Sequence, residues 1–184
     1  DAIALTVDTI VSGNRERCLR SGFTSPPRFI PASVLSYAIH PLWALNYMFR
    51  EKFALPNLQT HVDAGTNVAV SVAEYFNTML DTSMDWKMAE KVRSDWGGAF
   101  CLKGIMSVDD AKRAVDIGAT AIMVSNHGGR QLDGSRSPFD QIAEIADAVG
   151  GKIDIICDGG VQRGSHVLKA LAAGATACSG GRLY

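Results

Sequence analysis

The sequence predicts an α/β fold, a TIM (β/α)8 barrel of which about five carboxyl-terminal strands are present. First, short apolar runs alternate with capped helical segments through the second half of the chain. Second, these runs are apolar throughout, which favours burial on both faces and parallel pairing. Third, polar or glycine-rich residues follow five of the runs. Barrels place their sites at the carboxyl ends of their strands, whereas a doubly wound sheet concentrates its site at one switch point.

Local signals define the individual elements. Strands are expected at residues 1–8, 98–104, 119–127, 153–160 and 175–181, and helices at 86–97, 107–118, 137–150 and 163–174. Ser107 is expected to cap its helix, with acidic residues in the first turn and Gly118 closing the last. Ser137 is expected to cap the next helix, with Pro138 at its first position and Gly150 at its end.

Both ends of the sequence indicate that the chain is a piece of a longer protein. The chain begins without Met inside the strand "DAIALTVD", and it stops at "GGRLY", where a loop should enter a helix. The whole chain is expected to be one partial barrel domain. Such a piece is not expected to catalyse a reaction by itself.

A long inserted segment, residues 9–85, separates the first strand from the next clear helix and is far longer than an ordinary strand–helix loop. Its apolar stretch, Val34 to Phe49, is too short and too interrupted to span a bilayer. One interpretation is a lid or subunit-contact segment that buries its own apolar residues. The other is a membrane-docking patch with its aromatic residues at headgroup level and basic residues alongside, formed by Trp43, Tyr47, Phe49, Arg50 and Lys52.

Composition excludes several classes of function. The formal net charge of −1 offers no basic face for nucleic acid. The four cysteines form no CxxC pair, and two of them stand inside apolar strand-like runs, so buried free thiols in a reducing compartment are favoured. His40, His61 and His166 show no ligand spacing, so no metal site is expected.

Two glycine-rich turns predict a phosphorylated ligand. "CDGGVQRG" places Gly159 and Gly160 between a strand and a helix start, where backbone N–H groups can approach a phosphate. "SGGRLY" repeats the pattern after the next strand, with Arg182 available for a charged hydrogen bond. The loops after the last two strands are the habitual phosphate site of barrels.

The stretch "SNHGGRQLDG" predicts an acid–base site. Glycines beside His127 leave the backbone free to present it, and Arg130 can grip a carboxylate with two hydrogen bonds. Asp8 ends the first strand and could orient the imidazole, and Arg15 could supply a second carboxylate contact. Asp133 is expected to fix the turn.

Lys103 ends an otherwise apolar strand, where a cation needs a partner. It is expected to form an ion pair across the barrel mouth or to face developing negative charge on a ligand.

The stretches "LTVDT", "LKGI", "SNHGGRQLDG", "DGGVQRG" and the terminal "GR" resemble the FMN-dependent 2-hydroxy acid oxidase and dehydrogenase family over the whole chain. "SRSPFDQIAEIADAVG" and the inserted segment are most similar to bacterial L-lactate dehydrogenases that pass electrons to quinone. The resemblance implies FMN as cofactor, a small L-2-hydroxy acid such as L-lactate as substrate, and quinone as acceptor. It also implies a homotetramer and a peripheral place on the cytoplasmic face of the bacterial inner membrane, or otherwise the cytoplasm.

The resemblance also implies residue roles. His127 would be the active-site base with Asp8 as its partner, and Arg15 and Arg130 would bind the substrate carboxylate. Lys103 would lie beside the flavin N1–C2 carbonyl and stabilise the anionic reduced flavin. The remaining cofactor contacts would be made by the isoalloxazine ligands Thr6 and Ser125, by Asp158 at the ribityl hydroxyls, and by Gly159, Gly160, Gln162, Arg163, Gly181 and Arg182 around the phosphate.

Two departures and three alternatives accompany the resemblance. Many members of the family carry Arg where this chain has Gln162. Arg163 could take the place of that arginine in binding the phosphate. The family's amino-terminal strands, which supply substrate-contacting tyrosines, are not in the sequence. The alternatives are an oxidase that uses O2, a mandelate-type dehydrogenase, and a non-enzymatic phosphate-ligand-binding barrel or inactive fragment.

Overall fold

The structure is a computed structural model that describes residues 1–11, 13–14, 16–21, 30–50, 80–131, 134–181 and 183. The chain divides into two compact units, and each is described by itself. The first unit consists of Asp1–Asn14 and Asp81–Tyr184, and the second is Arg15–Leu80.

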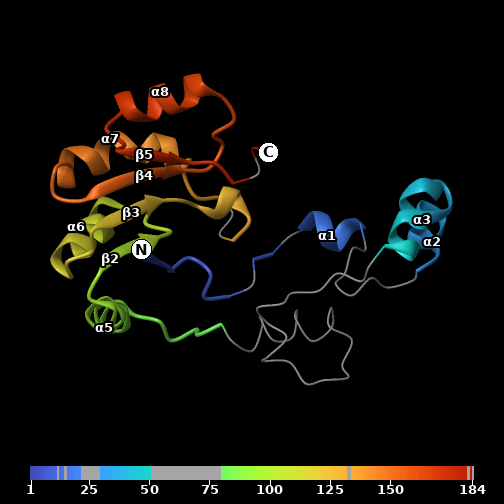
Figure 1. Ribbon diagram of the computed structural model, residues 1–184, viewed down its shortest axis with the longest axis horizontal. Helices are drawn as coiled ribbons and strands as arrows, with labels where there is room; N and C mark the ends of the chain where they lie inside the picture. Colours follow the sequence, from blue (N-terminus) through green and yellow to red (C-terminus); the bar gives the residue numbers. More distant parts are fainter. Residues whose placement is uncertain are drawn as a thin grey trace. The chain divides into compact units, whose positions relative to one another are not determined.

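The first unit contains a parallel sheet whose five strands follow one another in chain order (Figure 1). The strands are β1 (Ala2–Thr6), β2 (Ala99–Lys103), β3 (Ala121–Val124), β4 (Asp154–Asp158) and β5 (Ala177–Ser179). Every neighbouring pair is parallel. A doubly wound sheet would reverse its strand order at the switch point, whereas a barrel adds each strand beside the last. The order β1-β2-β3-β4-β5 therefore confirms the predicted barrel arrangement.

In the described part of the first unit, one helix leads into β2 and three more connect the strands that follow, and these helices lie along one side of the sheet (Figure 1). They are α5 (Trp86–Trp96), α6 (Val108–Asp116), α7 (Pro138–Val149) and α8 (Gly164–Ala172). The Ser107 hydroxyl accepts from the N–H of Asp110, as predicted for an N-cap. Ser137 stands at the N-cap of α7, but its side chain makes no capping bond. Pro138 begins this helix because its fixed φ suits the first turn and its missing N–H needs no partner there.

Burial distinguishes the two faces of the sheet, because residues paired in parallel strands share a face. Leu102, Ile122 and Ile155 are register partners, are at most 1% exposed, and belong to the core beneath the helices. Their neighbours Lys103 and Met123 on the other face are only half-buried. The buried Cys101 of β2 lies on this second face as well, so the face is partly buried in the described strands, and full burial on both faces stays a prediction.

Buried thiols stand in β2 and β4. Cys101 and Cys157 are free and buried, as the sequence predicts for cysteines inside apolar strands. Burial raises the pKa of both thiols. For Cys157, burial and the nearby Cys178 and Asp158 raise the pKa to about 11, so this thiol stays protonated at neutral pH.

The second unit contains α1 (Glu16–Ser21), α2 (Pro31–Ala38) and α3 (Pro41–Phe49). Helices α2 and α3 contact each other, and Trp43 stacks on both Tyr37 and Tyr47 at ring-centroid distances of 5.3 Å. Neither helix has a buried residue, although most of their side chains are apolar. Within the described residues, none of the helices has the length and apolar character needed to cross a membrane.

Candidate active site

The carboxyl ends of the strands bring the predicted cofactor side chains to one face of the sheet. Thr6 and Lys103 are register partners at the ends of β1 and β2. Asp158 pairs with Ser179 at the ends of β4 and β5. Ser125 follows Val124, the partner of Cys157, and so stands level with Asp158. The alternation of side chains along a strand places these residues on the half-buried face, opposite the helices.

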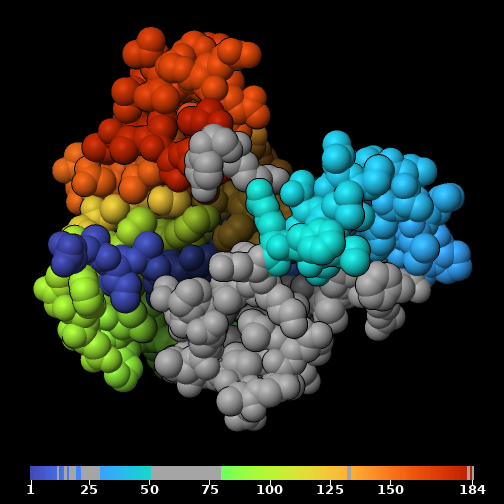
Figure 2. Space-filling view, turned by 45° about the vertical axis from the view of Figure 1, so that its right-hand side comes forward, coloured from blue at the N-terminus to red at the C-terminus, as the bar shows by residue number. Residues whose placement is uncertain are grey.

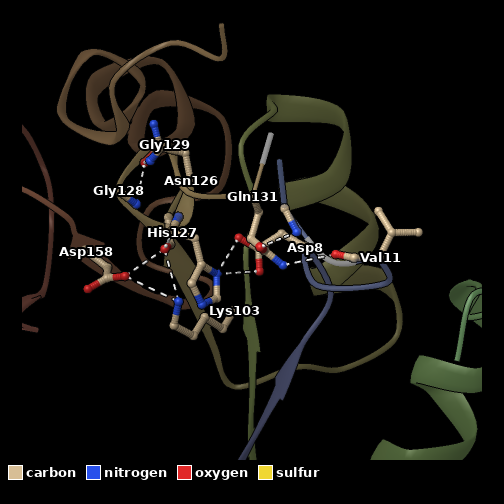
Figure 3. A network of polar contacts seen from close by, with 11 residues as sticks. Asp8, Val11, Lys103, Asn126, His127, Gly128, Gly129, Gln131 and Asp158 are labelled. Atoms are coloured by element: carbon tan, nitrogen blue, oxygen red, sulfur yellow. Dashed lines mark hydrogen bonds and ion pairs between the residues drawn. The ribbon is translucent and has the colours of Figure 1, made fainter. Parts of the chain in front are cut away.

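A network of three polar side chains lies at this edge (Figure 3). The hydroxyl of the fully buried Ser125 donates to Asp158 Oδ2 at 2.6 Å and accepts from Lys103 Nζ at 3.1 Å. Lys103 Nζ also lies 3.4 Å from Asp158 Oδ2, and the two side chains are 22% and 14% exposed. Lys103 thus forms the ion pair that its position predicted. Its side chain remains partly exposed, so it can also contact a ligand.

Asp158 is held in its ionised form by its neighbours. Burial opposes the charge, but hydrogen bonds from Ser125 and Ser179 and the ammonium of Lys103 outweigh it and lower the pKa of the carboxyl. A lowered pKa in the folded state means that the carboxylate contributes stability above its unfolded-state pKa, and that this contribution is lost as the pH falls through the folded-state value.

Replacing Asp158 by Asn should therefore destabilise the protein in a pH-dependent way. At pH 7, Asp158→Asn is expected to lower the free energy of unfolding, because Lys103 loses its ionised partner. Below about pH 4 the difference from the unsubstituted protein should shrink, because the carboxyl then takes up a proton in the unfolded state, while the folded state keeps it ionised until the pH falls through its lower pKa. Urea unfolding of both proteins at several pH values measures this difference in the free energy of unfolding. A difference that stays constant from pH 7 to pH 3 would contradict it.

His127 stands in a tight turn immediately after β3. It begins the 3-10 turn η2 (His127–Gly129) with φ of +56°, the left-handed region that residues other than glycine seldom adopt. The Asn126 side chain holds this turn by accepting from the N–H groups of Gly128 at 3.0 Å and Gly129 at 3.3 Å. Such an unfavourable backbone conformation persists where the surroundings enforce it, and it is common at functional sites.

Asp8 orients the imidazole of His127. Nδ1 lies 3.0 Å from Asp8 Oδ1 and 2.9 Å from Oδ2, and the histidine and aspartate side chains are 33% and 18% exposed. Donation from Nδ1–H to the carboxylate leaves Nε2 as the nitrogen that can accept a proton. The structure thus joins the predicted base to its predicted partner, across 119 residues of sequence.

Gly104 provides the space for the Asp8 carboxylate. Its φ is +108°, and a Cβ added there would stand 2.7 Å from Asp8 Cγ, 2.8 Å from Asp8 Cβ and 2.9 Å from Asp8 Oδ1. Both the backbone conformation and the close approach require glycine at this position.

The remaining predicted residues lie around this centre. Arg130 closes η2 with an exposed side chain. Gly159 and Gly160 have φ of +113° and +72° and form the turn after β4, and exposed Gln162 and Arg163 lead from it into α8. Gly181 follows β5. Arg15, Asp133 and Arg182 lie outside the described residues.

These residues fit a flavin mononucleotide. An added Cβ would meet nothing within 4 Å at either Gly160 or Gly181, so the backbone is open for a phosphate to approach at the ends of two adjacent strands. The amino terminus of α8 begins at Gly164, just after the first of these turns, and favours an anion. Lys103, Ser125 and Asp158 provide donors and acceptors for the polar edge and hydroxyl groups of such a ligand.

Two residues of the site were not predicted from the sequence. His166 Nδ1 lies 3.2 Å from Gly160 O and 3.3 Å from Gln162 N, so this side chain braces the glycine turn. Its place in the first turn of α8, directly after the glycine turn, was the signal in the sequence that could have indicated this contact. Gln131 contacts Val11 and Gly13, and no local pattern indicates a partner so distant in the sequence.

Two curated relatives carry names of L-lactate dehydrogenases. A putative L-lactate dehydrogenase of Mycobacterium tuberculosis (strain ATCC 25618 / H37Rv) is 36% identical over 184 residues, covering 100% of this chain and 43% of that protein. An L-lactate dehydrogenase of Actinobacillus pleuropneumoniae serotype 5b (strain L20) is 38% identical over 185 residues, covering 99% of this chain and 48% of that protein.

Solved structures of a mandelate dehydrogenase and a mandelate oxidase are also similar to this chain. The monotopic membrane protein (S)-mandelate dehydrogenase matches with a TM-score of 0.87 and 34% identity, covering 99% of this chain and 48% of that one. A mandelate oxidase with benzoyl-formic acid matches with a TM-score of 0.67 and 35% identity, covering 100% of this chain and 42% of that one. The chain thus spans less than half the length of these relatives. The family model of FMN-dependent dehydrogenases matches residues 1–184, and the chain belongs to this family.

Proposed function

We propose that the protein oxidises an L-2-hydroxy acid, in the first place L-lactate to pyruvate, with FMN as its cofactor. The observation that carries this proposal is the His127–Asp8 pair, which stands at the same carboxyl-terminal edge of the sheet as the network of Lys103, Ser125 and Asp158. A base beside a cation-bearing cofactor site suits a substrate that loses protons and electrons together. The names of the lactate dehydrogenase relatives support the choice of substrate.

In this proposal His127 takes a proton from the hydroxy acid at Nε2. Asp8 keeps Nδ1 protonated and stabilises the positive charge that the imidazole gains. Arg130 and Arg15 bind the substrate carboxylate, which fixes the reacting carbon near the base. FMN, when bound, would accept the two electrons and the second proton that the hydroxy acid loses as it becomes the 2-oxo acid.

The cofactor is assigned to residues at five strand ends. Lys103 places a positive charge where negative charge develops on the cofactor, and the buried Ser125 fixes its ammonium. The complete proposed set is Thr6, Lys103, Ser125, Asp158, Gly159, Gly160, Gln162, Arg163, Gly181 and Arg182. At Gln162 an amide stands in place of the arginine of many relatives, and the adjacent Arg163 supplies the charge.

A mandelate-type substrate is the second candidate, because the matched solved structures include a mandelate dehydrogenase and a mandelate oxidase. The two candidates separate in one experiment on the full-length protein. Formation of the 2-oxo acid is measured with L-lactate and with L-mandelate, using a soluble quinone or oxygen as acceptor. Faster turnover of L-lactate with quinone supports the first proposal. A preference for mandelate would overturn the choice of L-lactate as substrate. Peroxide production at a comparable rate in oxygen would overturn the choice of quinone as acceptor.

We also propose that α2 and α3 dock the protein on the cytoplasmic face of the bacterial membrane, where a quinone acceptor would be reached. The two helices belong to the inserted segment 9–85 and are drawn in light blue and cyan in Figure 2, and their exposed apolar side chains form the proposed patch. Leu42, Met48 and Phe49 are 78%, 74% and 81% exposed, and Trp43 and Arg50 are exposed as well. The matched mandelate dehydrogenase structure is that of a monotopic membrane protein, which supports this assignment. Lys52 lies outside the described residues.

Charges placed in this patch should abolish membrane binding. The double variant Leu42→Glu, Met48→Glu is expected to lose association with vesicles of phosphatidylcholine and phosphatidylglycerol, because an ionised side chain is expensive to bury at the lipid boundary. Turnover with a soluble acceptor should stay within about twofold, since the patch belongs to the other unit. Vesicle flotation measures the binding. Flotation of the variant equal to that of the unsubstituted protein would assign the segment to the lid or subunit-contact role.

A further inference from the structure

The side chain of Gln131 joins two loops that are distant in the sequence (Figure 3). Its Oε1 accepts from the backbone N–H of Gly13 at 3.1 Å, and its Nε2 donates to the backbone carbonyl of Val11 at 3.2 Å. The pairs are separated by 118 and 120 residues. Gln131 is half-buried at the end of the loop that carries His127 and Arg130. We call these two hydrogen bonds the Gln131 clip.

The chemistry of the clip requires a primary amide. Val11 offers an acceptor and Gly13 offers a donor, so the side chain between them must donate and accept at the same time. Glutamine does both from one planar group, an ionised glutamate can only accept, and methionine can replace neither bond well. Variants of this residue can therefore remove one bond or both without a large change in side-chain size.

Close packing of the two backbones supports the same conclusion independently. A Cβ added to Gly13 would stand 2.0 Å from the carbonyl oxygen of Arg130, 2.5 Å from Gln131 Oε1 and 2.9 Å from Gln131 Cα. Only glycine allows this approach, so the loop after β1 is built to lie against the loop after η2.

The clip acts on the same two loops as the acid–base pair. Asp8 stands three residues before Val11, and His127 stands four residues before Gln131. The backbone N–H of Val7 donates to Lys103 O at the end of β1, and beyond it the described part of residues 9–14 makes no other hydrogen bond to a different element. The Asp8 loop is thus held at its start by the sheet and at its far side by Gln131.

We infer that Gln131 is a positioning residue, which keeps the Asp8 carboxylate against His127 Nδ1 by holding the loop after β1 in place. The inference rests on the proposed role of His127 as the base. Asp8 must stay within hydrogen-bond distance while the imidazole gains its charge, and a displacement of about 1 Å in such a constellation can lower the rate by about 10²-fold. Gln131 itself touches the backbone of the loop and acts on the reaction through Asp8.

A double-mutant cycle tests this inference in the full-length holoenzyme. Gln131→Met is expected to lower kcat about 10- to 100-fold, with a smaller change in KM, and Gln131→Glu should recover part of the loss because it keeps the bond to Gly13. In the Asp8→Asn background, Gln131→Met should lower kcat by no more than about twofold, because the interaction on which it acts is already lost. FMN content from visible absorption and the melting temperature are measured for every variant.

The controls separate the possible failures. Arg136→Gln removes an exposed ion pair with Glu144 from the same stretch of chain, and it should leave kcat unchanged. If Asp8→Asn has no effect on kcat, the proposed function fails. If Asp8→Asn lowers kcat and Gln131→Met lowers it by the same factor in both backgrounds, the positioning role is wrong and Gln131 is only structural. If Gln131→Met does not fold, the Gln131→Glu cycle with Asp8→Asn decides the question by the same criterion.

Discussion

His127→Asn is expected to lower kcat for the hydroxy acid by about 10³-fold while the protein keeps its FMN. The variant removes the nitrogen that takes the proton, and an asparagine amide cannot serve as a base at neutral pH. Asparagine is chosen because it tolerates the left-handed φ of +56° better than most residues, so the turn should persist. Steady-state turnover and visible absorption spectra are the measurements.

The matched control for this prediction is Arg136→Gln, since Arg136 follows in the same stretch of chain and its side chain bonds to Glu144 and to the backbone carbonyl of Asp140 on α7. Unchanged formation of the 2-oxo acid by His127→Asn would exclude His127 as the base. Loss of FMN from the variant would instead assign the residue to cofactor binding.

Gly104→Ala is expected to lower kcat about 10²-fold by displacing Asp8 from His127. The added methyl would stand 2.7–2.9 Å from three atoms of the Asp8 side chain, closer than real side chains approach. The φ of +108° adds backbone strain of about 1–3 kcal/mol for alanine, so the melting temperature should fall as well. Turnover and thermal unfolding are measured on the same preparation.

Gly151→Ala separates strain from displacement. Gly151 also has a positive φ, +76°, but a Cβ there would meet nothing within 4 Å. This control should lose stability without a comparable loss of kcat. Equal losses of kcat in the two variants would show that Gly104 matters through general stability, and would contradict its role in seating Asp8.

Much of the fold and the centre of the site could be predicted from the sequence, because both depend on short-range signals. Apolar runs and helix caps gave the strand and helix positions, and parallel strands bring their carboxyl ends to one edge. Lys103, Ser125 and Asp158 stand at such ends, so their meeting follows from the fold. The pairing of Asp8 with His127 follows from the same geometry.

The contacts that the sequence did not reveal depend on tertiary packing. Gln131 finds its partners more than 100 residues away through the fit of one loop backbone on another, and no periodicity encodes that fit. The role of Gly104 is visible only once Asp8 stands beside it. Burial on both sheet faces was inferred from apolar content, and in the described strands the face opposite the helices is partly buried.

The most direct test of the central claim is the visible absorption spectrum of the full-length protein before and after anaerobic addition of L-lactate. The account predicts a flavin spectrum that bleaches with L-lactate in the unsubstituted protein and persists far longer in His127→Asn. A flavin spectrum unchanged by L-lactate and by L-mandelate, or one that bleaches equally fast without His127, would contradict the claim that this site oxidises a hydroxy acid with His127 as its base.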